Sequence, residues 1–292
     1  MSRSPATAES YAWCEKVARA QAKNFYYSFL LLSRGKRSAM CAIYAFMRYC
    51  DDLSDDDGIF SNDEGIRDRA AAIAQWRADL GAALGNPESA PQHPVWPAFV
   101  DTVRRFKIPH QYFFDMIDGV SSDLQPRRIQ TFDELYGYCY HVASVVGLTI
   151  IHIFGFHDPR ALELAEKCGI AFQITNILRD VREDAEKQRV YLPADDLQKF
   201  QVSAETFGPP ERFRELMVFE AGRAREYYRQ SAPLVGMVDQ GSRASLAALI
   251  AIYSTLLDRI VESDYDVLAR RIRLSTAEKL WLLVRSWFKG AA

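Results

Sequence analysis

The chain has 292 residues, of which 49% are hydrophobic, and a formal net charge of -2 from 36 basic and 38 acidic side chains. This length supports a sizeable core, and we expect one domain over residues 1–292, acting as a monomer or a weak dimer. The balanced charge gives no sign of an extended basic surface, so we expect no nucleic-acid partner.

Cysteine usage and the N-terminus bear on location. The five cysteines form no Cys-x-x-Cys pair, and an odd number in a chain of this size favours reduced thiols in a cytosolic protein. The N-terminus has no signal-peptide run. The most apolar window, residues 142–156, is too short and interrupted to span a bilayer, and it predicts a buried helix. We expect a cytoplasmic protein that at most rests on the inner face of a membrane.

Helical periodicity dominates the chain, and alternating runs of strand type are scarce. Proline and glycine punctuate the pattern at helix-length intervals, and Thr131 with Glu134 forms a capping box that marks a helix start. The pattern therefore predicts an all-α fold. The clearer helices are predicted over residues 7–23, 36–56, 63–82, 95–107, 110–121, 131–153, 159–185, 211–230, 240–262 and 275–288.

The second of these helices ends in a dense acidic run. Five aspartates occupy the seven positions from Asp51 to Asp57, directly after the apolar segment "AMCAIYAF". Asp51 and Asp55 lie four residues apart and so share one helix face, with Asp52 and Asp56 on the adjacent face. Like charges at this spacing repel by a few tenths of a kcal/mol per pair, so the run needs a counter-charge or solvent.

A second acidic ladder occurs in the helix predicted over residues 159–185. Asn176, Asp180 and Asp184 are spaced by four residues, and Gln173 extends the same stripe. Hard oxygen ligands of this kind suit Mg²⁺, which is usually held by one or two carboxylates together with substrate phosphates. Two such ladders facing each other could bind a cluster of Mg²⁺ ions that holds a diphosphate leaving group.

A single pair of aspartates at this spacing is more often a solvated helix face. Here two pairs occur, and each adjoins strongly apolar sequence, "AIYAF" and "GIAFQI", which a solvated face would not need. Arginines adjoin both ladders, as expected where a metal–diphosphate complex is clamped. The histidines show no zinc-binding spacing, and neither a Rossmann glycine motif nor a P-loop is present.

These residues resemble the squalene/phytoene synthase family of head-to-head prenyltransferases. The segments "AMCAIYAFMRYCDDLSDD" (39–56), "YGYCYHVASVVG" (136–147) and "NILRDVREDAEKQRVYLP" (176–193) carry the likeness, which extends over nearly the whole chain. The resemblance implies an all-helical isoprenoid-synthase fold around a central hydrophobic cavity. Two prenyl diphosphates would be joined there as a cyclopropylcarbinyl diphosphate. The N-terminal "NFYYSFLLL" is most similar to the bacterial branch, so we expect farnesyl diphosphate as substrate and presqualene diphosphate, or squalene, as product.

The resemblance also implies roles for individual residues. Asp51, Asp55, Asp180 and Asp184 carry over as metal ligands, with Asn176 as a further ligand and Gln173 in support. Tyr44, Arg48 and Arg179 carry over as diphosphate contacts, and Phe25, Tyr140 and Tyr253 as residues that line the cavity, with Tyr140 and Arg179 in the catalytic set. The neighbouring His141 stands where some relatives have tyrosine, and Tyr140, His141 or the released diphosphate could accept the proton.

Two further segments, one after the second ladder and one at the C-terminus, predict specific structures. "EKQRVYLP" (186–193) leaves its helix after Asp184, and we predict a flexible lid in which Tyr191 closes over the bound diphosphate. The C-terminal "AEKLWLLVRSWFKGAA" could form an amphipathic helix that lies on an anionic bilayer, or it could pack against the domain. Mg²⁺ is the expected metal, with Mn²⁺ as a substitute, and NADPH would be needed only if the reaction continues to squalene.

Three alternatives remain at this level. The enzyme could make phytoene from geranylgeranyl diphosphate or dehydrosqualene from farnesyl diphosphate, because cavity length cannot be read from one sequence. A non-catalytic assembly factor on the same fold would not need two intact acidic ladders. A terpene cyclase or chain-elongating prenyltransferase would share the "DDLSD" pattern but not the second ladder and "RVYLP".

Overall fold

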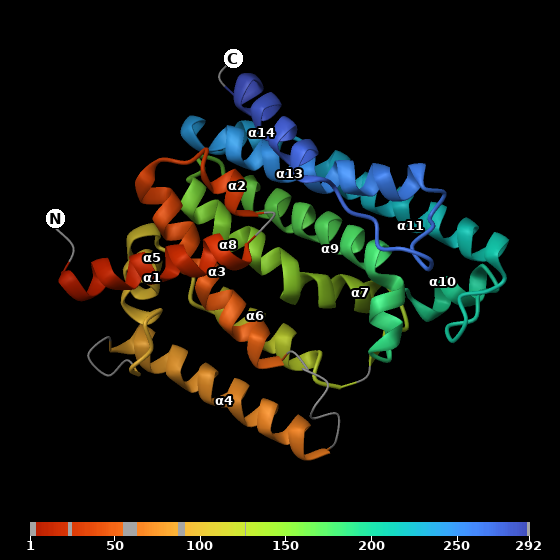
Figure 1. The fold of residues 1–292 in the computed structure, drawn as a ribbon, viewed down its shortest axis with the longest axis horizontal. Coiled ribbons are helices and arrows are strands. Elements are labelled where there is room, and N and C mark those ends of the chain that lie inside the picture. Colours follow the sequence, from red (N-terminus) through yellow and green to blue (C-terminus); the bar gives the residue numbers. More distant parts are fainter. Residues whose placement is uncertain (1–3, 23–24, 55–62, 87–90, 126, 291–292) are drawn as a thin grey trace.

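The computed structural model describes residues 4–22, 25–54, 63–86, 91–125 and 127–290, apart from the side chains of residues 25, 63, 64, 289 and 290. These residues are mostly helical, with strands of only two residues each, which confirms the all-α prediction (Figure 1). The elements are α1 (Pro5–Gln21), α2 (Phe25–Phe29), α3 (Arg34–Ser54), α4 (Asp63–Gly85), α5 (Trp96–Phe106), α6 (Gln111–Ser122), β1 (Arg127–Arg128), α7 (Phe132–Cys139), the π-helix η2 (Tyr140–Ser144), α8 (Val145–Phe154), α9 (Arg160–Glu186), β2 (Arg189–Val190), α10 (Ala194–Lys199), α11 (Pro210–Ser231), α12 (Leu234–Met237), α13 (Gln240–Glu262) and α14 (Thr276–Gly290).

Each predicted longer helix is present, with ends shifted by a few residues. Thr131 caps α7 as expected: its hydroxyl accepts from the Glu134 amide at 3.2 Å, and the Glu134 carboxylate accepts from the Gln130 amide at 2.8 Å. Ser275 and Glu278 form a second capping box at the start of α14. The short elements α2, α10, α12, β1 and β2 were not predicted, because they are too brief to show a period.

The helix predicted over residues 131–153 is interrupted by the π turn η2. Two neighbouring helices make their closest approach to this turn through glycines. A Cβ on Gly119 of α6 would lie 3.0 Å from His141, and one on Gly169 of α9 would lie 2.5 Å from the Cα of Ser144. Helical periodicity cannot reveal a π turn, since it inserts only one extra residue.

Buried aromatic rings join the N-terminal helices. The Phe46 ring of α3 lies 4.3 Å from the Phe99 ring of α5, 5.5 Å from the Trp76 ring of α4 and 5.6 Å from the Phe113 ring of α6, centroid to centroid. Because three helices contact the Phe46 side of α3, the opposite face of α3 is fixed in direction. That face carries Tyr44, Arg48 and Asp51.

Two stretches are long and apolar enough to cross a membrane by length and composition, Phe132–Phe154 and Gln240–Glu262. About half of each such window is buried inside the fold, at 50% and 56%. Both stretches contribute wall residues to an internal cavity, which accounts for their apolar composition. The predicted buried helix around residues 142–156 is thus confirmed.

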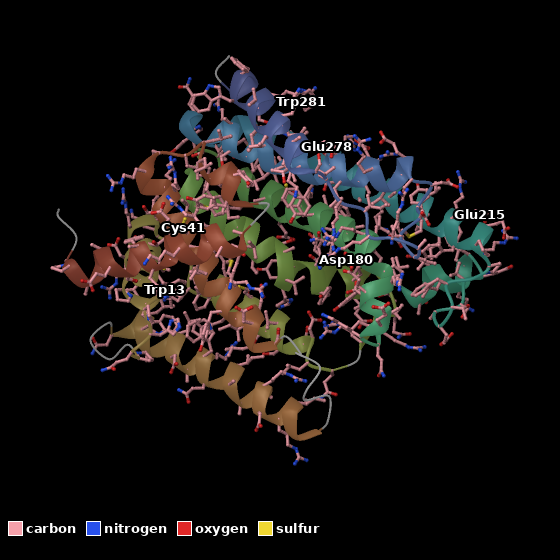
Figure 2. All side chains as sticks on the ribbon, in the orientation of Figure 1. Trp13, Cys41, Asp180, Glu215, Glu278 and Trp281 are labelled. Carbon is pink, nitrogen blue, oxygen red and sulfur yellow. The ribbon has the colours of Figure 1, made fainter. Side chains whose placement is uncertain are left out.

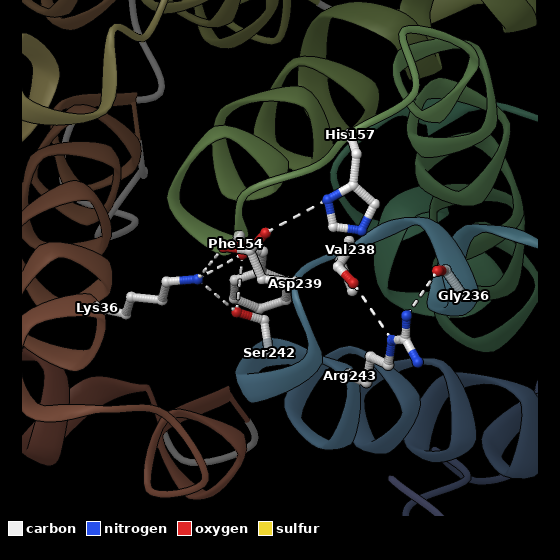
Figure 3. A network of polar contacts seen from close by, with 8 residues as sticks. All are labelled: Lys36, Phe154, His157, Gly236, Val238, Asp239, Ser242 and Arg243. Carbon is white, nitrogen blue, oxygen red and sulfur yellow. Dashed lines mark hydrogen bonds and ion pairs between the residues drawn. The ribbon is translucent and has the colours of Figure 1, made fainter.

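A polar cluster ties together the start of α3, the end of α8 and the start of α13 (Figure 3). The Lys36 ammonium donates to the Phe154 carbonyl at 2.5 Å, to the Ser242 hydroxyl at 2.9 Å and to the Asp239 carboxylate at 3.0 Å. Gly155, with φ of 74°, makes the turn that brings Asp239 close, and a Cβ there would lie 2.1 Å from the Asp239 carboxylate. We call Lys36, Phe154, Asp239 and Ser242 the floor cluster.

Candidate active site

A largely apolar cavity of about 330 Å³ lies between α2, α3, η2, α8, α9, α12 and α13. Its wall is hydrophobic except at one end, where polar side chains from three helices meet. The polar wall residues are Tyr44, Arg48 and Asp51 of α3, Gln173 and Asn176 of α9, and Tyr253 of α13.

The long axis of the cavity follows α3 and α9. On α3 the wall runs from Met40 to Asp51, and on α9 from Ala165 to Asn176. Each interval is eleven residues, which corresponds to about 16 Å of helix. The floor cluster closes the apolar end, because Lys36 precedes Met40 by one turn and Phe154 itself lines the wall. The cavity therefore has one polar end and one closed hydrocarbon end.

The second acidic ladder lies on the last three turns of α9: Asn176 lines the polar end of the cavity, and Asp180 and Asp184 follow on the next turns, beyond the residues that line it. Asp180 is mostly buried and is held between two guanidinium groups: Arg179 binds it in a bidentate pair, with one contact at 2.8 Å, and Arg271 approaches it at 3.0 Å. Arg271 also binds Glu183 at 2.8 Å. Asp180 lies toward the middle of the molecule in the view of Figure 2. The side chains of Arg179, Arg271 and Asp180 thus lie together near the C-terminal end of α9.

Asp184 occupies the next turn and has a raised pKa. Burial, reinforced by the nearby carboxylates of Asp180 and Asp123, raises the pKa of Asp184 to about 7, against the opposing effect of Arg189. Gathering carboxylates in a poorly solvated place disfavours their ionised forms unless a cation is present. A cation bound beside Asp184 would therefore favour the ionised form of its carboxyl group.

The first acidic run is described only in part. Asp51 is exposed at the polar end of the cavity, and Arg48 forms an ion pair with Asp52 one turn on. Burial raises the pKa of the nearby Tyr44 hydroxyl. Asp55 lies outside the described residues, as does the side chain of Phe25, so their predicted roles stay predictions.

Two observations show that these residues fit a divalent cation. The Oδ1 atom of Asn176 is buried and has no hydrogen-bond partner among the described residues, as expected for an oxygen reserved for a ligand. Asp180 and Asp184 follow it at one-turn spacing, and burial disfavours the ionised form of Asp184 where no cation is bound. Within the described part of the chain, no three His, Cys, Asp or Glu side chains form a closed metal cage. The donors instead suit Mg²⁺, which retains water and is completed by substrate phosphates.

Aromatic rings line the cavity next to the polar end. The Phe172 and Tyr253 rings stack with centroids 4.2 Å apart and planes within 10°. Burial raises the pKa of Tyr253 to about 12, so this hydroxyl stays protonated at neutral pH. Tyr253 lies on the cavity wall, and its predicted role toward the substrate stays a prediction.

Tyr140 is placed differently from the prediction. Neither Tyr140 nor His141 is among the residues that line the cavity. The Tyr140 hydroxyl lies 3.5 Å from the Asp115 carboxylate, and His141 Nδ1 lies 2.8 Å from the Gly137 carbonyl. The π turn directs the following residues, Val142 and Ala143, to the cavity in their place.

The predicted flexible lid at residues 186–193 is wrong for the described structure. After α9 the chain forms β2, which pairs in parallel with β1. Tyr191 is 6% exposed; its ring stacks on Tyr138 at 4.7 Å, and its hydroxyl donates to the Asp123 carboxylate at 2.9 Å. A tyrosine packed in this way supports the segment after Asp184 and does not cover a ligand.

Asp123 was missed by the sequence analysis. Its carboxylate accepts from the hydroxyls of Tyr138 and Tyr191, and its carbonyl accepts from Arg189 at 2.5 Å. These partners come from two other segments, α7 and the stretch that begins with β2, so no local pattern could have pointed to them. Asp123 fixes the segment that follows the second ladder.

Helices around an apolar cavity, with aspartates at its polar end, define an isoprenoid-synthase fold. A family model described as squalene/phytoene synthase matches residues 18–278, and the chain belongs to this family. A phytoene synthase of Arthrospira platensis is 36% identical over 96% of this chain and 94% of the relative. A crystal structure of a dehydrosqualene synthase superposes with a TM-score of 0.85 at 29% identity, covering 97% of both chains. A squalene synthase of Alicyclobacillus acidocaldarius has the same fold, with a TM-score of 0.78 at 24% identity over 88% of this chain and 94% of that one.

The protein is therefore a prenyltransferase of the family that condenses two prenyl diphosphates head to head. This family uses a divalent metal to bind diphosphate, and the donor set on α9 agrees with that use.

Proposed function

We propose that the protein joins two molecules of geranylgeranyl diphosphate head to head and releases phytoene. The cavity carries this proposal: it is apolar over about 16 Å of helix and polar at one end only, as a prenyl diphosphate requires. The choice of chain length is supported by the phytoene synthase of Arthrospira platensis, which matches almost end to end.

Each part of the site has a role in this reaction. The hydrocarbon tails bind along α3, α8, α9 and α13, where burial stabilises them by about 0.8 kcal/mol per methylene. Arg48, Arg179 and Arg271 hold diphosphate oxygens at the polar end. Mg²⁺ held by Asn176, Asp180, Asp184 and the first acidic run would neutralise the charge of the leaving diphosphate.

The cavity wall protects the cation that ionisation leaves behind. The stacked faces of Phe172 and Tyr253 adjoin Gln173 and Asn176, so the cation forms beside aromatic rings whose quadrupoles attract it. The closed apolar end excludes water that would quench it. The departing diphosphate is the proton acceptor in this proposal, since Tyr140 and His141 do not line the cavity. A route that ends in proton loss needs no reductant, so NADPH is not part of it.

A second candidate uses farnesyl diphosphate and gives presqualene diphosphate or dehydrosqualene, as the N-terminal segment suggests. The closed floor favours it, because Phe29 is 2% exposed and lines the wall, while Lys36 fixes the helices below. The dehydrosqualene synthase structure at 29% identity also supports it.

Product analysis separates the two candidates. Purified protein is incubated with Mg²⁺ and either farnesyl or geranylgeranyl diphosphate, with and without NADPH. A forty-carbon hydrocarbon formed without NADPH supports the proposal, and a thirty-carbon product moves the assignment to the second candidate. If neither substrate turns over while the protein is folded and Mg²⁺ is present, both candidates are wrong.

A further inference from the structure

The outer face of α14 is hydrophobic and exposed. Of the seven large hydrophobic side chains that are exposed in the described part of the chain, five lie on this helix and one, Leu30, lies on the turn after α2. The α14 residues recur at three- and four-residue spacing, so they share one helix face. They are Leu280, Trp281, Val284, Trp287 and Phe288.

The inner face of α14 is buried against the rest of the protein. Leu282, Leu283 and Ser286 are buried, and α14 packs along α13 (Figure 1). The fold therefore accounts for one side of the helix and leaves its aromatic side outward, with Trp281 at the edge of the molecule in Figure 2. Side chains such as Phe288, at 71% exposed, would not be expected in water without a partner.

The exposed face lies behind a wall of the cavity. Leu246, Leu249 and Tyr253 of α13 line the cavity, and α14 packs on the same helix from outside. The C-terminal end of α2 shows the same division: Phe29 is buried and lines the cavity, whereas the next residue, Leu30, is 44% exposed. The hydrocarbon site and the exposed face are thus separated by one layer of helix.

The charge around this face is positive. The α14 segment contains Lys279, Arg285 and Lys289 against the single acid Glu278, which is engaged by Arg259 at 2.7 Å. The Arg285 guanidinium lies 5.2 Å from the Trp281 ring centre. Near Leu30, Arg37 donates to the Leu30 carbonyl at 3.3 Å, and Arg34 is exposed.

We propose that Leu30 and the outer face of α14 form a docking surface for a bilayer that contains anionic lipid. Tryptophan and phenylalanine flanked by basic residues are the composition that inserts into the headgroup region of such a bilayer. A second copy of the chain fits less well, because an isologous contact would place the Arg285 side chains of the two copies near each other. The inference rests on exposure and charge and does not depend on the chain length of the substrate.

Vesicle binding tests the proposal without substrate. The whole protein is floated with phosphatidylcholine vesicles, with and without phosphatidylglycerol. We expect binding to the anionic vesicles that weakens as salt increases, and partitioning reduced by about tenfold or more in the variant Trp281→Ser/Trp287→Ser/Phe288→Ser. Val218→Ser is the matched control, since Val218, at 47% exposed, is the remaining large hydrophobic side chain on the surface of the described residues and lies on α11. That control should bind like the wild type.

A spectroscopic measurement covers the case in which the triple variant folds poorly. Trp281 and Trp287 are exposed, whereas Trp76 and Trp96 are buried, so brominated lipids should quench wild-type fluorescence through α14. The variant Trp281→Phe/Trp287→Phe should lose that quenching and keep its vesicle binding. Absence of wild-type binding, or equal binding by wild type and the folded triple variant, would overturn the proposal. A wild-type dimer that the triple variant turns into a monomer, without vesicle binding by either, would assign the surface to a second copy.

Discussion

Gly169 of α9 and Ser144 of η2 are in such close contact that no side chain fits between the two helices. A Cβ built on Gly169 would lie 2.5 Å from the Cα and 2.8 Å from the amide nitrogen of Ser144. Gly169 also lines the cavity beside Cys168 and Phe172. The spacing of these helices therefore sets both the packing of the bundle and the width of the hydrocarbon site.

We expect Gly169→Ala to destabilise the protein by about 1–3 kcal/mol, because the obstructing atoms are backbone and the helices must separate. Gly222→Ala on α11 is the control: a Cβ there meets nothing within 4 Å, and alanine favours a helix over glycine by up to about 1 kcal/mol. Chemical denaturation measures both changes. Equal stability of the two variants would show that the close contact between Gly169 and Ser144 does not affect the free energy of unfolding.

Asp180 is expected to be essential for turnover. Asp180→Asn keeps the shape of the side chain but removes the charge that pairs with Arg179 and Arg271 and that we propose binds the metal. We expect the condensation rate to fall by about 100-fold or more at saturating Mg²⁺, as for loss of one preorganised electrostatic group. Removal of divalent metal from the wild type should likewise abolish turnover.

The control for this prediction is Asp258→Asn, which breaks an exposed ion pair with Arg225 on the outside of the bundle. It should leave turnover unchanged. Circular dichroism establishes that both variants are folded. Near-normal activity of folded Asp180→Asn would refute the metal role of the second ladder.

The floor cluster should contribute to stability. Lys36→Met removes the donor shared by the Phe154 carbonyl, Asp239 and Ser242, and it leaves the Asp239 carboxylate without its ammonium partner. We expect a loss of about 1–3 kcal/mol in the free energy of unfolding. Lys167→Met, which breaks a surface pair with Glu163, should change stability little. If both variants unfold at the same denaturant concentration, the cluster does not hold the three helices together.

A buried acid far from the cavity predicts a pH dependence of stability. Burial, together with nearby Asp196, raises the pKa of Glu220 from 4.5 to about 7, although Arg223 opposes the shift. Between these two values the folded protein holds a proton that the unfolded chain has lost, so this residue lowers stability progressively as pH rises from 4.5 to 7. Below that window the penalty is absent, and above it the penalty is complete.

Comparison of the wild type with Glu220→Gln isolates the effect of this group. The melting temperature of the variant minus that of the wild type should increase from pH 5 to pH 8, whatever its sign at pH 5. A difference that decreases over this range would mean that Arg223 lowers the pKa of Glu220 below its ordinary value.

The helices and the chemistry of the polar end could be predicted because both depend on local spacing. Apolar residues at helical period fixed the positions of α3, α9 and α13, and four-residue intervals placed Asn176, Asp180 and Asp184 on one face. The resemblance carried by these segments was sufficient for the family. A helix face is a property of a few consecutive residues, so one sequence contains it.

The tertiary structure alone decided which side chains reach the cavity. Tyr140 is turned away by a π turn, Tyr191 is packed against Tyr138 and Asp123, and Lys36 closes the floor by reaching residues more than one hundred positions away. Each of these placements depends on how closely separate helices approach, as at Gly169 and Ser144. That distance is set by packing between segments remote in the chain, and no periodicity within a single segment records it.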